Sequence, residues 1–176
     1  MTKQITSVIS LFSICAVIAI VLALTNIPTA PKIQKNEEEK VKEAINQILP
    51  DGENGASFKE EDLSEYSNLP DTVKEVFYSE KLDGYVFKLE TKGYKPKMVV
   101  MCGITADATV SKAIYISGGE TIEDGKKYGD LFSDKAKQDV DSEPLVSGAT
   151  KTTKAYKSAI NDAFTAFEII NTKGGN

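Results

Sequence analysis

The chain has 176 residues and a formal net charge of −5, and its basic residues are all lysines, because arginine and histidine are absent. Without histidine there is no Ser-His-Asp relay and no His-ligated metal site, and without arginine there is no bidentate group for phosphate or guanine. The acidic balance also argues against nucleic acid as a partner, because phosphate contacts need a basic face. Any redox chemistry must therefore come from a cofactor.

Residues 5–24 form an apolar run without a single charge, ITSVISLFSICAVIAIVLAL. As a helix these twenty residues extend about 30 Å, which matches the hydrocarbon core of a bilayer. A cleaved signal peptide has a shorter apolar stretch and a small-x-small site, and a buried helix has polar positions at helical period. The run therefore predicts an uncleaved transmembrane anchor behind a short tail, residues 1–4. A short tail before a single span favours an extracytoplasmic C-terminal domain.

A soluble domain is predicted over residues 36–171, after a linker at 25–35 and before a tail at 172–176. Beyond residue 31 the chain carries 20 lysines and 26 acidic residues, a balance of −6. A domain of this charge is expected to dock on protein rather than on anionic lipid. Its first element is a helix over 36–49, with Asn36 as the predicted N-cap and Pro50 as the stop.

Four segments have the composition of strands, and their order predicts an antiparallel meander in an α+β fold. The polar stretch 51–70 is interpreted as a loop with a short helix, and 118–140 as irregular structure. A strong helix is predicted from 150 to 170, because apolar residues recur along one of its faces. The strand-like segments are 72–78, 84–90, 98–105 and 109–117.

The entry into that last helix, Leu145–Thr153, has the composition of an anion site. Gly148 lets backbone approach a ligand, Ala149 removes side-chain bulk, and hydroxyl groups surround the free N–H groups of the helix N-terminus. Such a site binds an anion through backbone amides and the helix dipole, without arginine. An ordinary Ser/Thr N-cap beside a small-residue turn remains the alternative.

The tetrapeptide Ser147-Gly148-Ala149-Thr150 resembles the S/T-G-A-T flavinylation motif of the FMN-binding domain in ion-translocating electron-transport complexes. That domain occurs in the G subunit of the Rnf-type complex and in the C subunit of the Na⁺-pumping NADH:quinone reductase. The resemblance covers nearly the whole chain in the family's order. It includes the apolar N-terminal run and the segments at 84–87, 92–94, 98–104, 113–116 and 120–121.

The resemblance implies that Thr150 carries FMN as a phosphoester, attached by a separate flavin transferase that uses FAD and Mg²⁺. It implies no catalytic residue and no metal ligand in this chain. The cofactor-binding residues that it implies are Thr150, Ser147, Gly148, Ala149, Thr153, Glu120 and Thr121.

Two positions depart from the family's pattern. The family usually has Asp three residues before the motif's Ser, where this chain has Pro144 with Asp141 and Glu143 nearby. The family's E-T pair is usually followed by a Pro-Gly-Leu-Gly type of loop, where this chain has residues 122–125, Ile-Glu-Asp-Gly.

The implied function is that of a membrane-anchored flavoprotein that relays electrons within an ion-translocating oxidoreductase complex, as an electron-transfer subunit rather than a complete enzyme. Its partners are then other membrane subunits and the flavin transferase, and its location is the cell membrane, with one span and an extracytoplasmic domain. The alternatives are a stand-alone extracytoplasmic flavoprotein and a flavin-free anchored adaptor.

The remaining reactive or aromatic side chains are interpreted as packing residues. Cys15 lies in the apolar run and Cys102 in a predicted strand, so no disulfide joins them. Cys102 is expected in the core. Tyr85, Phe87 and Tyr94 are expected to pack on the sheet, with the alternative that one of them stacks on a flavin ring.

Overall fold

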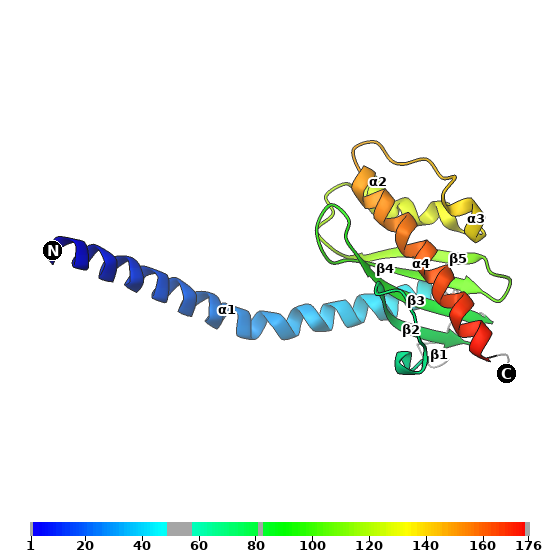
Figure 1. The fold of residues 1–176 in the computed structure, drawn as a ribbon, viewed down its shortest axis with the longest axis horizontal. Coiled ribbons are helices and arrows are strands. Elements are labelled where there is room, and N and C mark those ends of the chain that lie inside the picture. The colour runs from blue at the N-terminus through cyan, green and yellow to red at the C-terminus, as the bar shows by residue number, and fades with distance from the viewer. Residues whose placement is uncertain (1, 49–57, 81–82, 175–176) are drawn as a thin grey trace. The chain divides into compact units, whose positions relative to one another are not determined.

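The computed structural model describes residues 2–48, 58–80 and 83–174. The chain divides into two compact units, residues 1–39 and 40–176, and each is described by itself. The first unit consists of most of helix α1, which runs from Thr2 to Ile48 (Figure 1). The second unit holds the last turns of α1, the sheet and the other helices.

Helix α1 is continuous, so residues 25–35, predicted as a linker, are helical. Asn36 was predicted as an N-cap, and this is wrong, because a cap needs a non-helical residue and Asn36 lies inside the helix. Large apolar side chains between Val8 and Leu24 are exposed. Over the residues described here, no helix combines the length and apolarity needed to cross a membrane. The anchor over residues 5–24 therefore stays a prediction.

The second unit is built on a five-stranded sheet in the order β1-β2-β3-β4-β5, with every neighbouring pair antiparallel. The predicted meander is thus confirmed. β1 lies in the segment that the sequence assigned to a loop, and Phe58 pairs there with Ser79 of β2. The strands are β1 Phe58–Glu60, β2 Val73–Ser79, β3 Gly84–Thr91, β4 Met98–Thr105 and β5 Val110–Ser117.

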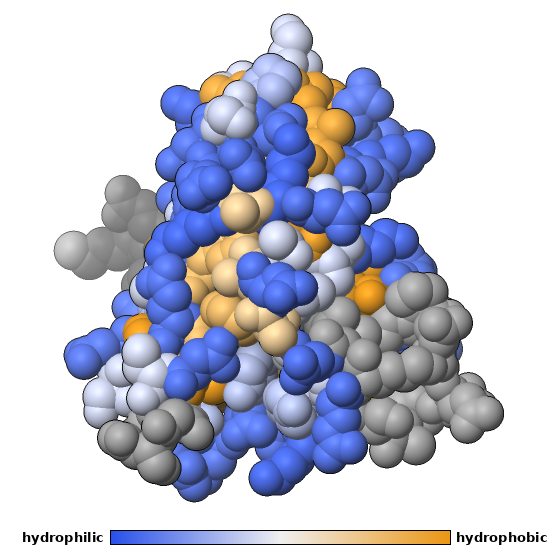
Figure 2. Space-filling model, turned by 90° about the vertical axis from the view of Figure 1, so that its right-hand side faces the viewer, coloured by the Kyte–Doolittle hydropathy of each residue, from blue (hydrophilic) through white to orange (hydrophobic). Residues whose placement is uncertain are grey.

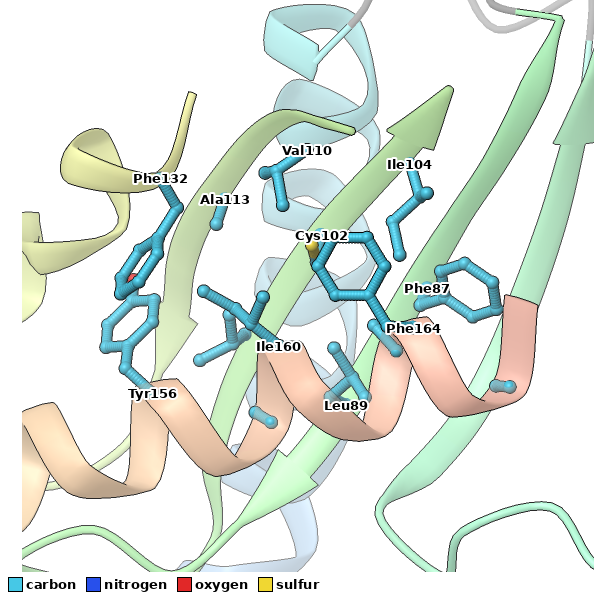
Figure 3. Close-up of a cluster of buried hydrophobic side chains, with 14 of the residues drawn as sticks. Phe87, Leu89, Cys102, Ile104, Val110, Ala113, Phe132, Tyr156, Ile160 and Phe164 are labelled. Carbon is cyan, nitrogen blue, oxygen red and sulfur yellow. The ribbon is translucent and has the colours of Figure 1, made fainter. Parts of the chain in front are cut away.

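Helices cover both faces of the sheet. α4, Thr150–Gly174, lies across one face (Figure 1), and its Ile160 and Phe164 pack on Phe87 and Cys102 in the main core (Figure 3). The last turns of α1 cover the other face, where Val41, Ala44, Ile45 and Ile48 pack against Val86, Met101 and Ile116. β4 is almost wholly buried because both of its faces are covered, as its apolar sequence predicts.

Residues 118–140, predicted as irregular, contain three short helices, α2 Glu123–Lys126, η2 Lys127–Phe132 and α3 Lys137–Val140. Tyr128 and Phe132 of η2 are buried, and the Tyr128 ring lies 6.0 Å from the ring of Tyr156 on α4. A short helix also forms within 51–70, as predicted, at η1 Leu63–Glu65.

The surface seen in Figure 2 is mostly hydrophilic around a pale apolar area. Large apolar side chains are exposed at four described positions of the second unit, namely Tyr94, Ile122, Leu131 and Leu145. The first of these was expected to pack on the sheet, and this is wrong, because Tyr94 lies in the turn between β3 and β4 and is 56% exposed.

Cys102 should be unreactive in the folded protein, because its side chain is fully buried and burial raises the pKa of its thiol to about 12. The thiolate is the species that alkylating agents attack. At mildly alkaline pH, iodoacetamide should modify the exposed Cys15 and spare Cys102 until a denaturant is added, as read by peptide mass spectrometry. Equal alkylation of the two cysteines in the folded chain would contradict the buried position.

Candidate functional site

The predicted anion site lies where the chain enters α4. The N–H of Ala149 donates to the carbonyl of Val146 at 3.1 Å, and the N–H of Thr153 donates to the carbonyl of Ala149 at 2.9 Å. Thr150 therefore opens the helix, and the N–H groups of the first turn precede the first intrahelical bond, which leaves them free for a ligand. Gly148 has φ +80°, the left-handed conformation that glycine adopts most easily.

The three threonines of the first turn of α4 have different environments. Thr150 is exposed, and its hydroxyl has no hydrogen-bond partner within the described part of the chain. Thr152 is 3% exposed and donates its hydroxyl to the carboxylate of Glu120. Thr153 is fully buried, and its hydroxyl lies 3.2 Å from the carbonyl of Ala149. Thr150 is thus the one of the three whose hydroxyl is available for chemistry.

Glu120 joins three separate segments at this site. It follows β5 and is only 5% exposed, and its carboxylate accepts the N–H of Lys95 at 3.1 Å as well as the hydroxyl of Thr152. A Cβ on Gly93 would lie 2.5 Å from Glu120 Oε1, so the β3–β4 turn approaches the carboxylate this closely only with glycine there. The contacts through Thr152 and Gly93 were not anticipated, because nothing local in the sequence marks a pairing across 32 positions.

The structure brings most of the predicted site residues together at the start of α4. Ser147 and Gly148 are exposed beside Thr150, and no atom lies within 4 Å of the position that a Cβ on Gly148 would take. Ala149 is buried and faces Gly125 of α2, where an added Cβ would come within 2.9 Å. The Thr153 hydroxyl is used inside the helix, and Thr121 is exposed next to Glu120.

The loop before the motif is fixed to the body of the domain. The ammonium of Lys157 on α4 donates to the carbonyls of Asp141, at 2.9 Å, and Glu143, at 2.5 Å. The hydroxyl of Tyr128 donates to the carbonyl of Pro144 at 3.0 Å. Pro144, at the position where the family usually has Asp, therefore takes part in the loop through its backbone.

The arrangement suits an anionic group attached to a hydroxyl. Free N–H groups and the positive end of a 25-residue helix face the open space above Gly148, and both favour negative charge. The ammonium of Lys151 adds a full positive charge next to Thr150. The described residues include no group of three or more His, Cys, Asp or Glu side chains with which to hold a metal ion.

Comparison with known proteins agrees with this chemistry. Residues 93–165 match the sequence profile of the FMN-binding domain family. The chain contains an FMN-binding domain. The matched segment begins at Gly93, which touches Glu120, and runs through the first turns of α4, so it includes every contact of the site described above.

The FMN-binding domain has a similar counterpart in a longer alignment. The chain is 26% identical to the G subunit of the Na⁺-translocating ferredoxin:NAD⁺ oxidoreductase complex of Acetobacterium woodii. That alignment runs over 183 residues and covers 90% of this chain and 88% of the relative. The similarity therefore extends well beyond the matched domain, into the segments on both sides of it.

Replacement of Glu120 should destabilise the domain. Glu120→Ala leaves the Lys95 N–H and the Thr152 hydroxyl without an acceptor in a buried position, and we expect a loss of about 2–3 kcal/mol in the free energy of unfolding. Glu120→Gln keeps one carbonyl acceptor and should lose about 1 kcal/mol. Denaturant unfolding followed by circular dichroism measures both values.

The matched control is Glu60→Ala, because Glu60 is an exposed glutamate on β1. It should change the free energy of unfolding by no more than about 0.5 kcal/mol. Equal stability of Glu120→Ala and Glu60→Ala would show that the buried contacts of Glu120 do not hold the site together.

Proposed function

We propose that the protein is an electron-transfer flavoprotein that carries FMN covalently on Thr150, through a phosphoester. The observation that supports this most directly is the sorting of the three threonines at the start of α4, since only Thr150 is exposed with a free hydroxyl. It lies in the matched FMN-binding domain and next to the free N–H groups of the helix N-terminus.

The proposed attachment is a transfer from FAD, catalysed by a separate flavin transferase with Mg²⁺. The Oγ1 of Thr150 forms a bond to the phosphorus that carries the riboflavin part, and the P–O bond of the pyrophosphate breaks. AMP leaves, and the hydroxyl proton is released to a base of the transferase or to water. The phosphodiester that remains keeps one negative charge, which the positive end of α4 stabilises.

The proposed roles of the other site residues follow from their positions. Ser147 and Gly148 leave the approach to Thr150 open, and buried Ala149 allows α4 to start close to α2. Glu120 and Thr153 hold the first turn of the helix in place, with exposed Thr121 at the edge of the site. FMN supplies the electron transfer, for which this chain has no residues of its own.

We further propose that the chain is a subunit of a membrane complex and passes electrons between the redox groups of its partner subunits. The similar protein of Acetobacterium woodii is named as part of such a complex. The uncharged run at residues 5–24 supports a single-pass anchor in the cell membrane with the domain of residues 36–171 on the extracytoplasmic side. The acidic balance of the part beyond residue 31 favours docking on proteins over anionic lipid.

Thr150→Ala should abolish flavin attachment. The full chain produced together with a flavin transferase should gain the mass of one FMN minus water, and the variant should keep the unmodified mass. Thr172→Ala is the matched control, because Thr172 is an exposed threonine near the other end of α4 and should not affect the gain. An unmodified wild-type chain, or a modified Thr150→Ala chain, would overturn the proposed attachment.

The proposed anchor predicts that the full chain stays in the membrane pellet after alkaline carbonate extraction, because twenty uncharged residues lie in the hydrocarbon core. Ser158 is an exposed residue of α4, so Ser158→Cys reports on the side that the domain occupies. A membrane-impermeant maleimide should label this variant in intact cells. Labelling only after permeabilisation would place the domain in the cytoplasm and contradict the proposed topology.

A further inference from the structure

Tyr94 is the only aromatic residue exposed in the described part of residues 40–176, with 56% of its surface accessible. Two ammonium groups lie near its ring. The Nζ of Lys95 is 5.7 Å from the ring centroid, and the Nζ of Lys151 is 5.9 Å from it. Lys151 directly follows Thr150, so the aromatic ring and both cations lie beside the proposed attachment point.

The turn that carries Tyr94 is held in this position by its backbone. The N–H of Lys95 donates to Glu120, and the same carboxylate accepts the hydroxyl of Thr152, which follows Lys151. Gly93, on the other side of Tyr94, packs against Glu120 with no room for a Cβ. Tyr94 is therefore fixed on both sides against the start of α4, although its ring is exposed.

The two lysines near the ring differ from several other lysines of this domain. Within the described residues, neither Lys95 nor Lys151 forms an ion pair, whereas Lys88, Lys126, Lys135 and Lys137 each contact a carboxylate. Their positive charge is thus available to an anionic ligand.

Exposed apolar residues also gather in the segments that meet here. Of the four large apolar side chains exposed in the described part of this unit, Tyr94 follows Gly93, Ile122 follows the Glu120-Thr121 pair and Leu145 shortly precedes Ser147. Apolar side chains that remain exposed beside a functional group are typical of a ligand surface.

We propose that Tyr94, Lys95 and Lys151 form the contact surface for the flavin carried on Thr150. The Tyr94 ring packs against the flat ring system of the flavin, and the two ammonium groups place positive charge next to its phosphate and ring. Glu120 is the positioning residue, because its hydrogen bonds hold the β3–β4 turn on α4. This inference rests on the proposed attachment of FMN to Thr150.

The first test is the fluorescence of the bound flavin in the full chain, produced together with a flavin transferase. A phenol ring packed on a flavin quenches its emission, so Tyr94→Leu should increase the fluorescence per attached flavin, and Tyr94→Phe should give a smaller increase. Intact mass confirms one FMN on each chain before the comparison, and circular dichroism confirms the fold. Equal fluorescence per flavin in the wild type, Tyr94→Leu and Tyr94→Phe would overturn the role of the ring.

The second test is the midpoint potential of the attached flavin. Positive charge near a flavin favours its electron-rich reduced form, so Lys151→Gln and Lys95→Gln should each shift the potential to lower values. The matched control is Lys154→Gln, which removes the same charge from an exposed position on α4 and should shift the potential less. Equal shifts for Lys151→Gln and Lys154→Gln would overturn the role of the lysines.

The two proposals fail in different ways. Absence of FMN from the wild-type chain overturns the attachment to Thr150, and with it this contact surface. Attachment of FMN to every chain, with fluorescence and potential unaffected by the Tyr94 and lysine substitutions, overturns the contact surface alone.

Discussion

The candidate site depends on the buried carboxylate of Glu120. A buried carboxylate is costly unless donors satisfy it, and here the backbone of Lys95 and the hydroxyl of Thr152 do so from positions 25 and 32 residues away. The three segments that meet at Glu120 are the β3–β4 turn, the end of β5 and the start of α4. Their separate positions thereby become a single constraint, and the environment of Thr150 follows from it.

The helical period explains how one segment serves both the core and the site. Thr152 and Thr153 face inward at the start of α4, in line with Tyr156 and Ile160 further along the buried side, whereas Thr150 lies on the exposed side. A chain without arginine or histidine holds a phosphate best with backbone N–H groups, lysine and a covalent bond. The first turn of α4 offers the first and last of these, and Lys151 offers the second.

Much of the fold could be predicted from the sequence because its signals are local. The bounds of β4 and the start of α4 were predicted to the residue, since an apolar run and a small-residue turn mark them. The short strand β1 has a polar sequence and exists through its pairing with β2, and α1 continues through a segment that contains two prolines, so neither has a local signal. The site was predicted as a list of residues, but the contact of Glu120 with Thr152 and the exposure of Tyr94 arise only from the packing of distant segments.

The position of Thr150 at the end of α4 has a consequence for electron transfer. The buried face of this helix is part of the main core, and the loop before it is held by Lys157 and Tyr128. A cofactor bonded there moves with the rigid body of the domain and cannot swing on a flexible arm, as a carrier on a long side chain does. Electrons then reach and leave it only when a partner's redox group approaches this corner of the domain, so the timing of transfer is set by motions of the whole domain and of its partners.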